Sequence, residues 1–130
     1  YYLMSDDGSV GEKGLVTQKL EELIKNGQKI DKVIAIGPLI MMKFVCQLTK
    51  QYDIPTVVSM NPIMIDGTGM CGGCRLMVDG KMKFACVDGP DFDGHLVDFD
   101  AAMSRNRQYF EKERHDYEAT CNLLNKKEEN

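Results

Sequence analysis

In residues 1–60, short continuous apolar runs alternate with longer segments whose apolar residues recur at the period of a helix. Short apolar runs at residues 1–4, 32–36 and 55–60 predict strands, and the central one (KVIAI) is typical of a strand buried on both faces. Between them, residues 14–26 and 39–52 carry apolar positions on one face and predict two helices. Gly27 would end the first helix, and Gly37-Pro38 would begin the second. Strands that alternate with helices predict an α/β layer structure with a parallel sheet.

After residue 60 the chain becomes rich in Gly and Asp up to residue 94. Two short strand patterns, at residues 75–78 and 81–85, flank Asp79-Gly80, a dipeptide that favours a tight hairpin turn.

Residues 98–125 predict one long polar helix, with Asp98 or Asp100 as its N-cap. A narrow apolar stripe recurs every seven residues at Met103, Phe110, Tyr117 and Leu124. The stripe either docks on the chain's own domain or forms a seam with a partner, and the last residues (KKEEN) predict a solvated tail.

The composition and net charge of the chain limit the kinds of function that it could have. At 130 residues the chain suits one domain, and a net charge of −4 offers no basic surface for nucleic acid. No apolar run is long enough to span a bilayer, so no membrane association is expected. Free cysteines without a signal peptide favour a cytoplasmic location. The chain starts at Tyr1 inside a strand pattern, which suggests a piece of a longer protein.

Asp66, Cys71, Cys74 and Cys86 form the motif D-x4-C-x2-C-x11-C. Plant-type [2Fe–2S] centres use C-x4-C-x2-C and a distant fourth Cys, and here a carboxylate stands in the first position. Each iron needs two anionic donors, and the intervening glycines let the backbone approach a ligand closely. The predicted hairpin brings Cys74 and Cys86 together. The motif therefore predicts iron-sulfur ligation by these four side chains.

Two alternatives remain open. The three cysteines with His95 could bind tetrahedral zinc and stabilise a module that only binds protein, or the thiols could be unligated. We expect a structural hydrogen bond for His95, a buried hydrophobic role for Cys46 and no special role for Cys121.

Two loops occupy the places where open α/β sheets bind ligands: residues 5–9, which contain Asp6 and Asp7, and residues 37–39. An acidic side chain after a strand can bind a ribose hydroxyl, but these aspartates could equally cap a turn. There is no G-x-G-x-x-G, so the residues alone do not establish a dinucleotide site.

The segment SMNPIMIDGTGMCGGCR, with FACVDGPDFDGHLVDFDAAMSRNR after it, resembles the flavin- and iron-sulfur-containing electron-transfer subunits of the ferredoxin-reductase superfamily. Within that family, the aspartate at position 66 resembles the branch of NADH-dependent reduced ferredoxin:NADP oxidoreductases (sulfide dehydrogenase β subunits). The dihydroorotate dehydrogenase branch uses four cysteines.

The resemblance implies FAD, NAD(P) and a [2Fe–2S] cluster in the full-length protein. It implies electron transfer to a larger partner subunit similar to the small subunit of glutamate synthase, with no catalytic side chain required. It divides this chain into the C-terminal half of an NAD(P)-binding domain (residues 1–60), a cluster module (61–97) and a C-terminal helix with its tail (98–130). By itself this piece is expected to be inactive. The implied nucleotide-binding residues are Asp6, Asp7, Gly8, Ser9, Gly11, Gly14, Gly37 and Pro38.

Overall fold

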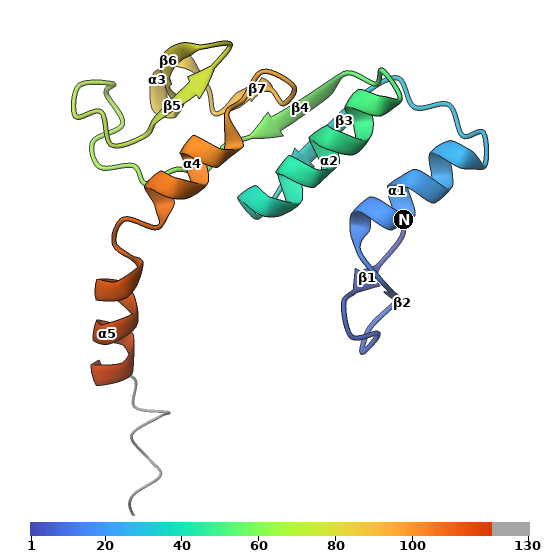
Figure 1. Ribbon diagram of the computed structural model, residues 1–130, viewed down its shortest axis with the longest axis horizontal. Coiled ribbons are helices and arrows are strands. Elements are labelled where there is room, and N and C mark those ends of the chain that lie inside the picture. Colours follow the sequence, from blue (N-terminus) through green and yellow to red (C-terminus); the bar gives the residue numbers. More distant parts are fainter. Residues whose placement is uncertain (121–130) are drawn as a thin grey trace, which may run out of the picture.

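The computed structural model describes residues 1–120 and shows a mixed α/β chain that is extended rather than round (Figure 1). Strands β1 and β2 with helix α1 lie at one end, and the hairpin β5–β6 lies at the other. The strands form three separate sheets, in the orders β1-β2, β3-β4-β7 and β5-β6. No helix in the described part of the chain is long and apolar enough to cross a membrane.

The central sheet is mixed. Strand β3 (Val33–Ile36) pairs in parallel with β4 (Thr56–Ser59), and β7 (Asp91–Asp93) pairs antiparallel with the other side of β4. The predicted parallel arrangement therefore holds for β3 and β4, which are joined through a helix as parallel neighbours require. The antiparallel third strand was not predicted.

Helix α2 (Leu39–Gln51) covers one face of this sheet. Its side chains Met42, Val45, Cys46 and Thr49 are buried, and they pack with Val58 of β4 in the main hydrophobic core. Burial of such apolar side chains supplies most of the stabilisation of the layer.

The opposite face of β3 is uncovered. Ile34 and Ile36 are 67% and 71% exposed, whereas Ala35 between them is buried against α2. The prediction that this strand is buried on both faces is therefore wrong for the chain described here, because no second layer packs on the isoleucine side.

The N-terminal part forms its own small unit. Strands β1 (Met4–Ser5) and β2 (Glu12–Lys13) pair in parallel, and α1 (Val16–Lys25) follows and contacts α2. Helix α1 ends where the sequence predicts, since Asn26 is its C-cap and Gly27 takes φ = +80°.

The hairpin forms as predicted. Strands β5 (Arg75–Val78) and β6 (Lys81–Phe84) pair antiparallel around Asp79 and Gly80, whose φ angles are +51° and +67°. Two positive φ angles in succession characterise the type I′ turn that matches strand twist. Helix α3 (Ala85–Asp88) follows at once, so Ala85 belongs to a helix and not to the strand.

The segment between β4 and β7 leaves the central sheet and rejoins it at adjacent positions. Ser59 pairs with Asp91, and the Met60 N–H donates to the Pro90 carbonyl over 2.9 Å. The hairpin is attached to the following segment by the bridge between Val78 and Val97. Backbone hydrogen bonds therefore hold the two ends of the segment between β4 and β7 next to each other.

The predicted long C-terminal helix is two helices. Helix α4 (Phe99–Asn106) begins at the Asp98 N-cap, whose carboxylate accepts from the Ala101 N–H over 2.9 Å, and α5 (Phe110–Thr120) points away from the body of the molecule. Phe99 and Ala102 hold α4 against the core, but α5 buries no side chain.

The apolar stripe divides at this break. Met103 packs against the core, while Phe110 and Tyr117 are exposed, and Leu124 lies outside the described residues. Sequence periodicity missed the break because it cannot tell which part of a stripe has a surface to pack against.

Candidate metal centre and nucleotide region

The hairpin places Cys74 beside Cys86. Cys74 directly precedes β5 and Cys86 lies in α3 just after β6, and their sulfurs are 3.2 Å apart. The Ala85 N–H donates to the Cys74 carbonyl over 3.1 Å and continues the strand pairing into this pair. Cys74 is buried and Cys86 is half-buried. The predicted convergence of these two thiols is what the structure shows.

The two thiols are hydrogen-bonded to each other, and their pKa values shift in opposite directions. Burial by itself would raise the pKa of Cys74, but hydrogen bonds from the backbone and thiol of Cys86 hold it below its usual value. The pKa of Cys86 is raised, chiefly because its thiol is hydrogen-bonded to Cys74. This pair is therefore biased toward the thiolate that a metal ion requires.

Asp66 and Cys71 form a second pair on an exposed loop. The Thr68 N–H donates to Asp66 Oδ1 over 2.9 Å and is the main reason that the pKa of Asp66 lies below its usual value. A hydrogen bond with the Cys71 side chain lowers that pKa further. Cys71 Sγ in turn accepts from the Gly73 N–H over 3.4 Å. The carboxylate is thus held ionised next to a solvent-facing sulfur.

Glycines shape the loop that joins the two pairs. Gly67, Gly69 and Gly72 all have φ between +68° and +81°, where a side chain would be strained. The Gly69 N–H hydrogen-bonds to Cys86 and opposes the rise of its pKa, so the loop after Asp66 reaches the hairpin pair. Among residues 1–120 the donors occur as pairs, with no group of three or more around one point.

His95 is engaged elsewhere. Its Nε2 lies 3.0 Å from Thr49 Oγ1, and Thr49 Oγ1 lies 2.6 Å from Thr56 Oγ1. Thr49 and Thr56 are buried, so these groups satisfy one another between α2, β4 and the loop after β7. The predicted structural role of His95 is confirmed, and the fourth ligand that the zinc alternative needs is hydrogen-bonded to Thr49 and is not grouped with the cysteines in the described part of the chain.

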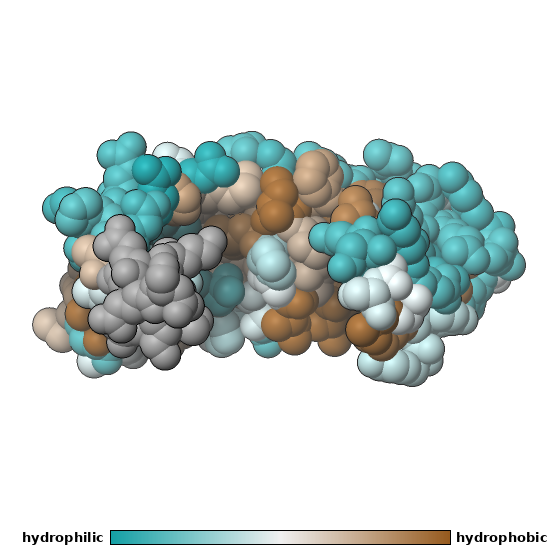
Figure 2. Space-filling model, turned by 90° about the horizontal axis from the view of Figure 1, so that it is seen from below, coloured by the Kyte–Doolittle hydropathy of each residue, from teal (hydrophilic) through white to brown (hydrophobic). Residues whose placement is uncertain are grey.

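Three of the predicted nucleotide residues line one cavity. Asp6, Gly14 and Pro38 border a space of about 750 Å³ between α1 and α2, together with apolar side chains such as Phe44 and Leu48. Figure 2 shows hydrophobic surface gathered near the middle of one face, beside a largely hydrophilic region at the right-hand end.

The other predicted nucleotide residues lie outside this cavity lining. Asp7 accepts from the Ser9 N–H over 2.9 Å, which lowers the pKa of Asp7 and gives it the turn-capping role left open from the sequence. Gly8 lies against Lys13, and Gly11 has no room for a side chain beside the Leu3 carbonyl. Gly37 has φ = +155°, with the Met41 side chain close to it.

Sequence reasoning missed Arg105. Its Nη2 donates to the Gly73 carbonyl over 3.4 Å and so connects α4 to the C-x2-C turn. One signal was available, because Arg105 lies three residues after buried Ala102 and therefore at the edge of the packed face of α4.

Comparison with known proteins identifies the segment that contains this hairpin. Residues 61–98 match the iron-sulfur cluster binding domain of dihydroorotate dehydrogenase B. This match defines the class: the segment with the hairpin and the four predicted ligands is an iron-sulfur cluster binding domain.

The relatives extend beyond that segment. A Clostridium beijerinckii protein described as "uncharacterized protein in adh 3′region" is 59% identical over 109 residues, which are 83% of this chain and 37% of that protein. A Thermotoga maritima homologue of the dihydroorotate dehydrogenase B (NAD(+)) electron transfer subunit is 51% identical over 116 residues, which are 89% of this chain and 41% of the homologue.

A solved structure matches as well. A chain from the structure of NADH-dependent reduced ferredoxin-NADP oxidoreductase, described in connection with flavin-based electron bifurcation, superposes with a TM-score of 0.80 at 48% identity, over 91% of this chain and 42% of that chain. The chain is thus similar to the homologues of the dihydroorotate dehydrogenase B electron transfer subunit, and it spans about two fifths of the length of the relatives it matches.

Proposed function

We propose that residues 61–98 hold a [2Fe–2S] cluster through Asp66, Cys71, Cys74 and Cys86, and that the protein passes electrons through it. The observation that carries this proposal is the arrangement of the donors in two pairs, Asp66 with Cys71 and Cys74 with Cys86. A two-iron cluster takes two anionic donors on each iron, so three thiols and one carboxylate paired in this way fit the group.

The chain's own residues would bind such a cluster and adjust its reduction potential. The cluster, when bound, supplies one-electron transfer. The Gly73 and Gly69 N–H groups are directed at the sulfurs of Cys71 and Cys86, and hydrogen bonds to sulfur raise the reduction potential of a cluster. The partial burial of Cys74 and Cys86 lowers the local dielectric constant on one side, while Asp66 and Cys71 keep the other side open to solvent.

We propose that residues 1–60 are half of an NAD(P)-binding domain in a longer protein that also binds FAD. The open isoleucine face of β3 supports this, because a continuous apolar strand is typical of parallel sheets with both faces covered. The location of Asp6, Gly14 and Pro38 around one cavity supports a ligand near these loops. The remainder of the domain would cover Ile34 and Ile36.

The partner proposed for the full-length protein is a larger flavin and iron-sulfur subunit similar to the small subunit of glutamate synthase. The names of the relatives leave two kinds of oxidoreductase as candidates. Asp66 favours the reduced ferredoxin-NADP type, since the dihydroorotate dehydrogenase type is expected to use a fourth cysteine. With the partner present, NADP⁺ reduction would support the first type and dihydroorotate oxidation the second.

The test is anaerobic purification of the full-length protein, followed by iron, acid-labile sulfide and zinc analysis and electron paramagnetic resonance (EPR) after reduction with NADH. We expect about two irons and two sulfides per chain, with loss of both in Cys74→Ser. Cys46→Ser is the matched control, because Cys46 is a buried cysteine in α2 with no predicted metal role. Colourless protein with stoichiometric zinc would reject the electron-transfer function in favour of a zinc-stabilised binding module.

A further inference from the structure

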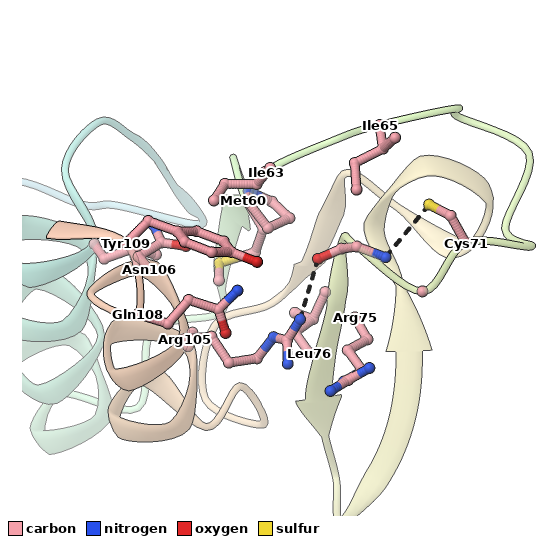
Figure 3. A pocket seen from close by; sticks show the side chains of 15 residues that line it. Met60, Ile63, Ile65, Cys71, Arg75, Leu76, Arg105, Asn106, Gln108 and Tyr109 are labelled. Atoms are coloured by element: carbon pink, nitrogen blue, oxygen red, sulfur yellow. Dashed lines mark hydrogen bonds between the residues drawn. The ribbon is translucent and has the colours of Figure 1, made fainter. Parts of the chain in front are cut away.

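A cavity of about 270 Å³ lies between the C-x2-C turn and helix α4 (Figure 3). Cys71 borders it, so it is adjacent to the proposed cluster. Its charged side chains are the guanidinium groups of Arg75 and Arg105, and no carboxylate lines it among the residues that the structure describes. A cavity whose described lining residues carry two positive charges and no negative charge is unusual in a chain whose net charge is −4.

Gly73 connects one of these arginines to a predicted ligand. Its N–H donates to Cys71 Sγ over 3.4 Å, and its carbonyl accepts from Arg105 Nη2 over 3.4 Å. Figure 3 shows both contacts on opposite sides of the same residue. Arg105 therefore holds the turn that carries the Cys71 sulfur.

Neither guanidinium has an ion-pair partner within the described part of the chain. By contrast, Lys43 is 2.7 Å from Asp100 at the other side of α4, and Lys19 is paired with Glu12. Arg75 Nη1 lies 3.7 Å from the position that a Cβ on Gly72 would occupy, so it too lies against the C-x2-C turn. Two positive charges without an ion-pair partner among the described residues thus lie against the C-x2-C turn, Arg105 at Gly73 and Arg75 at Gly72.

The proposed cluster would supply the missing negative charge. An oxidised two-iron, two-sulfide core with three thiolates and one carboxylate carries a formal double negative charge. One electron from a reduced flavin would convert one ferric ion to ferrous and would add a third negative charge. Nearby cations stabilise the more negative, reduced state more than the oxidised state, and so they raise the reduction potential.

Resting on the proposed function, we infer that Arg75 and Arg105 are the counter-charges of the cluster and set its reduction potential, and that Arg105 is also a positioning residue for the Cys71 turn. Arg105 acts through the Gly73 backbone and through its charge. Arg75 acts through its charge alone, since it makes no hydrogen bond to the turn.

The test is an EPR-monitored redox titration of the anaerobically purified, cluster-loaded full-length protein. Arg105→Gln and Arg75→Gln should each lower the midpoint potential. At a fixed solution potential, we expect the ratio of reduced to oxidised cluster to fall roughly tenfold. This is the effect expected, after screening, from the loss of one unit charge within about 8 Å of the cluster. A tenfold change is about 59 mV for one electron. Arg107→Gln, two residues away and outside the cavity lining, should leave the potential unchanged.

Arg105→Lys separates charge from position. Lysine keeps the positive charge but lacks the planar guanidinium group with its several N–H donors. The reduction potential of the cluster in this variant should therefore lie near that of the wild type, while the EPR line shape changes. A potential as low as that of Arg105→Gln would reject the counter-charge role.

Equal potentials in the wild type and in the Arg75→Gln and Arg105→Gln variants, with normal iron content, would overturn this inference and leave the proposed function standing. A wild-type protein without iron would overturn both.

Discussion

The sulfurs of Cys74 and Cys86 lie 3.2 Å apart although twelve positions separate the two residues in the chain. The antiparallel register that pairs Arg75 with Phe84 produces this proximity. Formation of a disulfide would require the sulfurs to approach to about 2.05 Å, a small movement.

We therefore predict that a mild oxidant such as diamide cross-links Cys74 to Cys86 in cluster-free protein. Each thiol gives up one hydrogen to the oxidant as the bond forms. Peptide mass spectrometry should find this pair as the dominant cross-link, and Cys74→Ser should abolish it. A dominant link between Cys71 and Cys74 would contradict the geometry described above.

A second prediction concerns the carboxylate of Asp66. Asp66→Cys should retain the cluster and shift both its midpoint potential and its visible spectrum, because thiolate is a softer and more electron-donating ligand than carboxylate. Asp66→Ala should lower the iron content to less than about half, as expected when a ligand is lost. Asp31→Cys, on an exposed loop, is the control for an added thiol. An unchanged potential and spectrum in Asp66→Cys would remove Asp66 from the ligand set.

A third prediction concerns the hydroxyl of Thr49, which lies between His95 and Thr56. Thr49→Val keeps the side-chain shape but leaves His95 without this partner and removes one contact of Thr56. We expect a loss of about 1–3 kcal/mol in the free energy of unfolding, measured by urea denaturation.

Thr17→Val on α1 is the matched control for this change. Thr17 borders the cavity between α1 and α2 and is not part of the buried network, so its substitution should cost less than about 0.5 kcal/mol. Equal effects of the two changes would show that the network adds nothing to stability.

A fourth prediction uses Cys46, because burial raises the pKa of its thiol to about 11 from the model-peptide value of 9.0. The folded protein keeps this proton in a pH range where the unfolded chain has released it. The stabilisation is therefore complete below pH 9 and is lost as pH rises toward 11.

The wild type should consequently lose about 1–2 kcal/mol more than Cys46→Ala between these two pH values, after an allowance for partial screening. Urea denaturation at pH 8, 9 and about 10.5 measures the difference. Parallel pH profiles of the two proteins would show that Cys46 titrates normally.

Local chemistry accounts for what the sequence predicted well. Asp79-Gly80 specifies its turn by itself, and from that turn the approach of Cys74 and Cys86 follows. Apolar periodicity was sufficient for α1, which contacts α2, and for α2, which packs on the central sheet.

Features that depend on distant contacts were not predictable in the same way. The contact between Arg105 and Gly73 joins a helix to a loop that lies 32 positions earlier. The interruption after Asn106 depends on where the core ends, and the exposure of Ile34 depends on which elements pack on the second face of β3. In each case the deciding partner is remote in sequence.

The closure of residues 60–90 at their base has a consequence for electron tunnelling. Tunnelling rates fall steeply with the separation between donor and acceptor, so a redox carrier on a flexible tether would sample many rates. Here the backbone bonds between Met60 and Pro90 and between Ser59 and Asp91 tie both ends of the excursion to one strand of the sheet. The backbone pairing therefore holds the segment that carries the sulfurs at a defined place beside the central sheet, and a cluster bound there would have a fixed separation from that sheet.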